Sequence, residues 1–236
     1  MSGAWVAKRF WKEATAEACE GGFTVKLDGR GVKTPAKTPL VVPTLALAQA
    51  IAAEWDAQTE KVRPESMPYT RAANSALDKV TPQFAEVAGL LAAYGASDLL
   101  CYRAAHPAAL TDRQAAAWDP LLQWCATALH APLHATTGVV HIEQPPESLS
   151  RLTAKVHAFT AFELAAVHDL IAISGSLVLA LAVTEGVKTP QAIWDLSRID
   201  EVWQAEHWGA DDEATESEAV RHEGLLQAGR FFALCR

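Results

Sequence analysis

The sequence has little that would mark a secreted or membrane-spanning protein. Its four cysteines include no CxxC pair, and a chain of 236 residues can bury a large core without disulfides. We therefore expect free thiols in a reducing compartment. The N-terminal segment carries charges early and lacks an apolar run, which excludes a secretory signal. In the most apolar stretch, residues 164–183, His168-Asp169 and Ser174-Gly175-Ser176 interrupt the run, so we expect buried helices there and not a membrane span.

An excess of basic residues is also lacking. The formal net charge is -8. Between Asp195 and Glu223 there are ten acidic and two basic residues, and the other residues hold 18 of each sign. A chain with an acidic end and no basic stripe is a poor candidate for binding nucleic acid or an anionic membrane. Half of the residues are hydrophobic and 20% are charged, which predicts a folded globular protein.

The first forty residues show the period of two that is typical of strands. Phe23, Val25 and Leu27 alternate with polar residues, and Asp28-Gly29 is a strong signal for a two-residue hairpin turn. Proline ends the segments that follow. The pattern predicts a small antiparallel sheet with strands at residues 23–28, 30–34 and 40–42.

After Pro43 the period becomes that of a helix, because Leu47, Ile51 and Trp55 lie four residues apart. The segment 59–69 is polar and holds two prolines, which favours a linker. We therefore predict an α+β fold, with a small, mostly antiparallel β domain carrying one helix (residues 1–62) and a larger, all-helical C-terminal domain (residues 63–236).

Several helix starts are marked by a side-chain acceptor followed by proline at the first helical position. They are Thr81-Pro82, Asp119-Pro120 and Thr189-Pro190, and Thr111 with Gln114 has the spacing of a capping box. Gly209 is placed to end a helix. The predicted helices are 82–94, 112–118, 120–130, 147–158, 162–182, 190–207 and 212–233, with a short strand at 139–142.

A catalytic constellation is not found. The glycines and lysine at 29–34 lack the spacing of a phosphate-binding loop. His130 and His134 have metal-ligand spacing, but Pro132 would break the helix that the spacing needs. His168-Asp169 are adjacent and would point in different directions on a helix. The serines around Gly175 do not form a nucleophile elbow. We therefore predict no cofactor, no metal and no enzymatic activity.

The last third combines acidic residues with tryptophans. At helical spacing, Trp194, Arg198 and Glu201 fall on a face other than that of the apolar residues, and further acids and a tryptophan follow. Tryptophan is prominent in interface hot spots, and carboxylates can orient a basic partner. From the residues alone, two interpretations stay open: a partner-binding surface, or core tryptophans beside a solvated acidic face.

One ordered set of short motifs resembles the ATP synthase assembly chaperones that attend the alpha subunit of the soluble catalytic head, a family of mitochondria and alphaproteobacteria. The set covers nearly the whole chain in the right order. It comprises Leu27-Asp28-Gly29-Arg30, Lys33-Thr34-Pro35, Glu54-Trp55 with Gln58, Met67-Pro68, Thr70-Arg71, Ser174-Gly175-Ser176, and the run from Asp200-Glu201 through Trp208-Gly209 to Asp211.

The resemblance implies an ATP-independent chaperone that binds the unassembled alpha subunit, shields its oligomer interface and hands it to the beta subunit. It implies a two-domain α+β fold. It places partner-binding residues among the acids and tryptophan of the last third, namely Glu201, Glu206, Trp208 and Asp211. Trp55 matches the family but lies on an apolar stripe, so we interpret it as a structural anchor, together with Gly29 and Gly175.

Two alternatives remain open. One is a small-molecule enzyme that uses Arg30, Lys33 and a histidine on an anionic substrate; the other is a protein-interaction scaffold with a different client. For the chaperone we expect a protein that is monomeric when free. We expect it in the bacterial cytoplasm, with the mitochondrial matrix as the alternative location.

Overall fold

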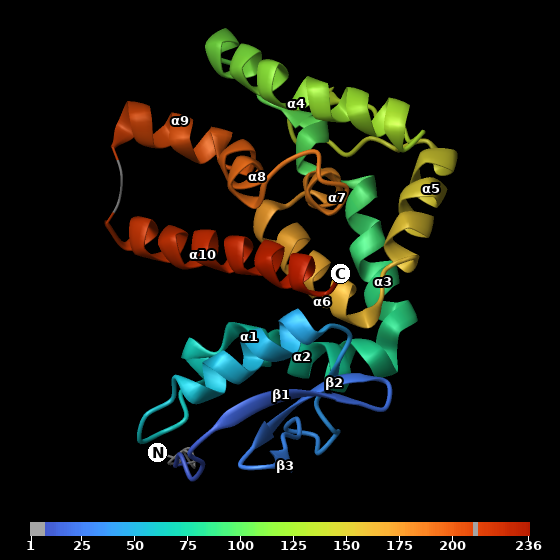
Figure 1. The fold of residues 1–236 in the computed structure, drawn as a ribbon. Helices are drawn as coiled ribbons and strands as arrows, with labels where there is room; N and C mark the ends of the chain where they lie inside the picture. The colour runs from blue at the N-terminus through green and yellow to red at the C-terminus, as the bar shows by residue number, and fades with distance from the viewer. Residues whose placement is uncertain (1–7, 210–211) are drawn as a thin grey trace. The chain divides into compact units, whose positions relative to one another are not determined.

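The computed structural model describes residues 8–209 and 212–236, and the chain divides into two compact units. Unit 1 comprises the described residues up to Phe84 together with Thr160–Ala166 and Arg230–Arg236; unit 2 comprises Ala85–Phe159 and Val167–Gly229. An antiparallel sheet precedes a long run of helices (Figure 1), which confirms the α+β fold class. The sequence predicts a domain boundary between residues 62 and 63, and this boundary stays a prediction.

The sheet of unit 1 is built around its second strand. The strands are β1 (Ala14–Cys19), β2 (Gly22–Leu27), β3 (Arg30–Gly31) and β4 (Val41–Val42), and β2 pairs antiparallel with each of the others. Val25 and Leu27 are buried, as the alternation predicts. The sequence did not predict β1, because alanine and glutamate dominate it and both are weak strand formers.

The return strand is shorter than predicted. It ends at Gly31 and not at Thr34, because the backbone beyond it pairs with the next segment: Thr34 N donates to the Thr38 carbonyl at 2.9 Å, and Lys33 forms an isolated bridge with Pro39. The Thr34 hydroxyl donates to Asp78 Oδ1 at 2.6 Å. The turn before it is as predicted. Asp28 has φ 48° and Gly29 has φ 80°, and a two-residue hairpin turn needs positive φ at both positions.

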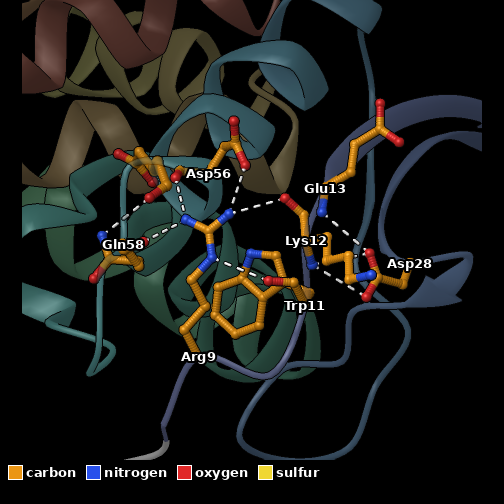
Figure 2. Close-up of polar contacts among 8 residues, drawn as sticks. Arg9, Trp11, Lys12, Glu13, Asp28, Asp56 and Gln58 are labelled. Carbon is orange, nitrogen blue, oxygen red and sulfur yellow. Dashed lines mark hydrogen bonds and ion pairs between the residues drawn. The ribbon is translucent and has the colours of Figure 1, made fainter.

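Asp28 also holds the segment that precedes the sheet (Figure 2). Its carboxylate accepts hydrogen bonds from the backbone N–H of Lys12 at 3.0 Å and of Glu13 at 3.1 Å. These backbone donors lower the pKa of the Asp28 carboxyl, because they stabilise its charged form. The hairpin turn and the N-terminal segment are therefore joined through one exposed carboxylate.

Arg9 fastens the same segment to the end of helix α1 (Leu45–Asp56) (Figure 2). Its guanidinium donates to the backbone oxygens of Asp56 at 2.6 Å and of Lys12 at 3.0 Å, and to Asp56 Oδ1 at 3.0 Å. The last carbonyl groups of a helix lack partners and form the negative end of its dipole. The Arg9 guanidinium has five N–H donors and a positive charge. It can therefore donate hydrogen bonds to these carbonyl groups and also interact favourably with the negative end of the helix dipole.

Helix α1 begins after Pro43 and has a buried apolar face, as predicted. The Thr44 hydroxyl accepts from Leu47 N at 3.1 Å and caps the first turn. The side chains of Leu47 and Ile51 are fully buried, and α1 packs against β1 and β2. The hydrophobic face of α1 therefore covers the sheet within unit 1.

The segment after α1, predicted as a linker, is held by polar contacts. Glu54 belongs to α1, and its carboxylate reaches the first turn of α2 (Pro68–Ser75), where it accepts from Tyr69 N at 2.6 Å and from Thr70 N at 2.8 Å. Gln58 accepts from Arg63 N at 2.7 Å and donates to the backbone oxygen of Glu54 at 3.0 Å. These glutamate, glutamine and threonine residues belong to the motif set described above, so part of that set joins α1 to α2.

The remaining elements are mostly helical. They are α3 (Phe84–Ala92), α4 (Ala108–Ala128), α5 (Pro146–His157), α6 (Ala161–Ser174), α7 (Leu177–Thr184), α8 (Pro190–Ser197), α9 (Ile199–Trp208) and α10 (Asp212–Leu234), with short 3-10 helices at Pro64–Ser66, Thr81–Gln83, Ala93–Ala96 and Leu99–Cys101 and a π turn at Ala76–Val80. β5 (Tyr102–Arg103) and β6 (Thr136–Thr137) form a parallel pair. The strand predicted at 139–142 is wrong, because Val139 and Val140 are exposed in a loop.

Helix α4 replaces two predicted helices and runs through Pro120. Its buried residues, spaced three or four apart along the whole helix, are Leu110, Gln114, Trp118, Leu121 and Cys125. This continuous face outweighs the cost of about 3 kcal/mol for an interior proline. Asp119 is therefore not a cap, and it pairs instead with Arg103 at 2.7 Å. The predicted caps at Thr81 and Thr111 are also wrong, because Thr81 lies within the 3-10 helix Thr81–Gln83 and Thr111 lies inside α4.

The predicted helix 162–182 is two helices, α6 and α7, separated at Gly175. Gly175 has φ 74°, a conformation that side-chain-bearing residues rarely adopt. Its carbonyl accepts from Leu99 N at 3.2 Å. Ser176 caps α7, accepting from Leu179 N at 3.0 Å. The expectation of buried helices in this stretch is confirmed for α7, in which seven of the eight residues are buried.

The buried carboxylate of Asp98 lies at the start of α7. Asp98 is 0% exposed, and it accepts from Ser176 Oγ at 2.7 Å, from Val178 N at 2.9 Å and from Leu100 N at 3.0 Å. Burial raises the pKa of Asp98, and these donors oppose that effect. The carboxylate thereby satisfies free N–H groups of two helical segments at once.

By length and composition alone, one stretch of the described residues, Pro68–Cys101, could cross a membrane; 39% of its apolar window is buried. The structure divides this stretch into α2, a π turn, α3 and short 3-10 helices. Core helices of globular proteins pass the same test.

Replacement of Asp98 by alanine should lower the free energy of unfolding by about 3 kcal/mol or more, because three buried donors lose their acceptor. Urea denaturation followed by circular dichroism measures the change. The control is Asp112→Ala on the exposed side of α4, for which we expect less than about 0.5 kcal/mol. Equal effects of the two changes would contradict the role assigned to Asp98.

Replacement of Asp28 by asparagine should reduce the acid sensitivity of the protein. The folded pKa of Asp28 lies below its ordinary value of 3.8. Its contribution to stability is therefore present above 3.8 and lost as the pH falls through the lowered pKa. Urea midpoints measured between neutral pH and strong acid should fall less steeply for Asp28→Asn than for the parent chain. Parallel pH profiles would rule out this contribution.

Candidate partner-binding surface

The expected partner-binding residues lie on and after α9. The predicted helix 190–207 is in fact α8 and α9, which are separated at Arg198 (φ -111°, ψ 14°). Thr189 caps α8, accepting from Ala192 N at 3.1 Å, and Gly209 ends α9 with φ 89°, as the sequence predicts for both. Asp211 lies outside the described residues.

One face of α9 carries Glu201 and Trp208. They are seven residues apart, which is about two helical turns, so they share a face. Trp208 is 78% exposed, and Gln204 and Ala205 between them are exposed as well. An exposed tryptophan and a carboxylate therefore lie together on a surface that this structure leaves uncovered.

The opposite face of α9 turns toward α4, against which α9 packs. Ile199 is buried and Trp203 is half-buried on this side. Glu206 belongs here and not with Trp208, because its Oε2 lies 2.8 Å from Arg113 Nη1 of α4. Asp200 accepts from Gln114 Nε2 of α4 at 2.6 Å. The structure thus separates Glu206 from the other two expected residues.

Arg198 links the exposed face to α8 and α10. Its Nη1 lies 2.7 Å from Glu201 Oε1, and its Nε lies 3.1 Å from Glu218 Oε1 of α10. The guanidinium carbon stands 5.4 Å from the ring centroid of Trp194, a distance typical of cation–π contacts. Glu201 is therefore held in a fixed direction by a largely buried cation.

The expectation for Trp194 needs correction. It shares a cluster with Arg198 and Glu201, as its spacing predicts, but it is buried at 8% exposure. The ring of His222 from α10 covers it, with 4.9 Å between centroids. Sequence reasoning missed Glu218 and His222, since a helix period relates residues within one helix and these two belong to the next.

The anchor residues lie in ordinary structural positions. Trp55 is half-buried and meets Trp11 edge to face, with 5.2 Å between ring centroids. Gly29 and Gly175 hold the positive-φ positions described above. Their roles as anchors stay predictions, and the burial of Trp55 supports its assignment.

Residues weighed for other chemistry do not converge. Arg30 and Lys33 lie at the hairpin. His168 and Asp169, expected to point apart, do meet at 2.8 Å, but both are more than half exposed. Hydrogen bonding to Asp169 raises the pKa of His168. Across residues 8–209 and 216–236, no group of three or more potential metal ligands is found.

Comparisons with known proteins point to one family. A family model described as "ATP12 chaperone protein" matches residues 8–126. "Protein atp12, mitochondrial" of Schizosaccharomyces pombe is 22% identical over 240 residues, covering 97% of this chain and 82% of that protein.

Two solved structures are similar over nearly the whole chain. The crystal structure of Atp12 from Paracoccus denitrificans is 49% identical, with a TM-score of 0.95 and coverage of 98% of this chain and 99% of that chain. A protein from Agrobacterium tumefaciens is 41% identical, with a TM-score of 0.93 and coverage of 98% and 87%. These two structures span α9, which the matched family model does not reach.

The same substitution should act differently at two tryptophans. Trp55→Arg should lower the free energy of unfolding by about 3 kcal/mol or more, because it removes a packed ring and places a charge beside Trp11. Trp208→Arg should change it by less than about 0.5 kcal/mol, because the side chain is exposed. Thermal denaturation of the two variants side by side measures the contrast. An unchanged melting temperature for Trp55→Arg would refute the anchor role.

Proposed function

The chain belongs to the ATP12 family of ATP synthase assembly chaperones, and we propose that it binds the unassembled alpha subunit of the catalytic head. In this proposal it shields the surface that the alpha subunit later buries against its neighbours, and it releases the subunit when the beta subunit takes that place. The family is one of chaperones and not of enzymes.

The observation that carries the proposal is the face of α9. Trp208 exposes 78% of its surface, and Glu201 is fixed beside it by Arg198 at 2.7 Å. A large aromatic ring that can be buried on binding, with a carboxylate at its edge, is the arrangement found in protein interface hot spots. Since the chain is a chaperone, the natural occupant of this face is the client.

Shielding explains why such a surface needs no catalytic group. A subunit made before its neighbours exposes an oligomer interface that would otherwise associate wrongly. A chaperone that covers part of this interface lowers the concentration of the aggregation-prone form by mass action. The beta subunit can displace it if it buries more of the same surface. Neither step uses nucleotide hydrolysis by the chaperone.

The residues divide into two roles. Glu201 and Trp208 face outward and are the proposed contact residues. Glu206 contributes through its half-exposed ion pair with Arg113, and Asp211, outside the described residues, stays part of the proposal by resemblance. We also propose that the chain acts as a monomer in the bacterial cytoplasm, in keeping with its relatives from Paracoccus and Agrobacterium.

Co-expression with the alpha subunit, without the beta subunit, tests the function. The chain should keep alpha soluble and comigrate with it on gel filtration, and added beta should dissolve the complex. Glu201→Lys should weaken capture by about tenfold, because it reverses the charge presented to the client. Circular dichroism should still report a folded protein, because the largely buried Arg198 keeps Glu218 as its partner when Glu201 is replaced.

The control is Glu185→Lys, which also reverses a glutamate of similar exposure in an ion pair, here with the half-exposed Lys155 at 2.9 Å. It should capture alpha normally. Aggregated alpha with no complex at any salt concentration would overturn the function itself. Normal capture by Glu201→Lys, with capture by the parent chain intact, would overturn only the choice of surface.

A further inference from the structure

We infer that Gln114, a side chain of α4 outside the contact surface, is the positioning residue that sets the direction in which α9 presents Glu201 and Trp208. This inference rests on the proposed function for its consequence in client capture. Its structural part concerns α4 and α9 alone and can be measured without a client.

Gln114 is 1% exposed, and both ends of its amide are used. Its Oε1 accepts from the backbone N–H of Ala104 at 2.8 Å, and its Nε2 donates to Asp200 Oδ1 at 2.6 Å. The backbone donor fixes which end of the amide faces which way, because an N–H group can only bind the oxygen. The nitrogen is therefore committed to the carboxylate of α9.

Apart from the pair of Arg198 with Glu201 described above, the described residues of α9 have few contacts that hold its orientation. Ile199 is buried and Trp203 is half-buried, whereas residues 201, 202 and 204–208 are exposed. Its other side-chain contact with α4, Glu206 with Arg113, has exposures of 48% and 38%, and such exposed pairs hold weakly. A hydrogen bond from a buried amide to a carboxylate is the stronger type. Gln114 therefore supplies the stronger of these two polar constraints between α4 and α9.

This constraint acts on rotation about the helix axis. Successive residues of an α-helix lie about 100° apart around the axis. Asp200 is fixed toward α4, so its neighbour Glu201 must point away, and Trp208 follows on the same side. If the bond from Gln114 were lost, α9 could turn, and the carboxylate and the ring would no longer face the client together.

Four variants isolate the bond. Gln114→Glu keeps the acceptor for Ala104 but sets two carboxylates against each other. Asp200→Asn keeps an oxygen that can accept from Gln114 and serves as the matched control. The double variant Gln114→Glu with Asp200→Asn restores the bond with donor and acceptor exchanged. Asp200→Ala removes the bond without burying a new charge, and it serves if Gln114→Glu fails to fold.

Amide hydrogen exchange of residues 199–208 is the first readout. Gln114→Glu and Asp200→Ala should exchange about tenfold faster or more than the parent chain, since a buried bond to a charged group is lost. Asp200→Asn and the double variant should exchange near the parental rate. Capture of the alpha subunit should weaken by about threefold or more in the first two variants and recover in the double variant, because affinity scales with the competent fraction.

Unchanged exchange in Asp200→Ala would overturn the inference, as would a double variant that stays as fast as Gln114→Glu. If exchange follows the expected pattern but capture of alpha responds to none of the variants, the positioning role in the client site is overturned. Glu201→Lys then separates the two proposals: a loss of capture in that variant keeps the surface of the proposed function, whereas normal capture overturns that surface as well.

Discussion

Asp98 places a carboxylate in the fully buried interior of unit 2, where Ser176, Val178 and Leu100 donate to it. Burying an ionised group costs several kcal/mol unless hydrogen bonds and dipoles replace water. Here the free N–H groups at the start of α7 supply them. Asp98 thus accepts the hydrogen bonds that the N–H groups at the start of α7 would otherwise donate to water. The helix can therefore be buried along its apolar length, and α4 and α8 pack against it.

The packing of α4 and α8 on α7 in turn supports α9, the helix that carries the candidate surface. Trp118 of α4 donates to the backbone oxygen of Leu196 at the end of α8 at 2.8 Å, and Gln114, one turn earlier, donates to Asp200 at the start of α9. The exposed face with Glu201 and Trp208 is therefore the last member of a series of contacts that begins in the core. The side chains of this face belong to α9 alone, but the direction in which they point depends on the packing of α4 and α8.

Local signals in the sequence predicted the features that depend on neighbours along the chain. The Asp28-Gly29 turn, the cap at Thr189, the end at Gly209 and the apolar face of α1 all follow from residues within one turn of each other. Predictions from the sequence were wrong where contacts between residues far apart in the chain determine the structure. Pro120 is tolerated because α4 has a continuous buried face, and Gln114 looked like a capping residue although its partner is 86 residues away. For the candidate surface, the period of α9 predicts that Glu201 and Trp208 share a face, but only the structure shows that Glu206 turns to Arg113.

The polar contacts between α1 and α2 are made by residues of the family motifs. Glu54 and Gln58 hold backbone groups in place, and the Thr70 hydroxyl donates to the Glu54 carboxylate. Ser176 donates to the buried carboxylate of Asp98. These motifs therefore identify the scaffold of a family member and carry no information about which client it binds. Because α9 lies outside the matched region 8–126 and exposes most of its side chains, changes on that helix alter the surface offered to a client while the motifs between residues 27 and 71 stay intact.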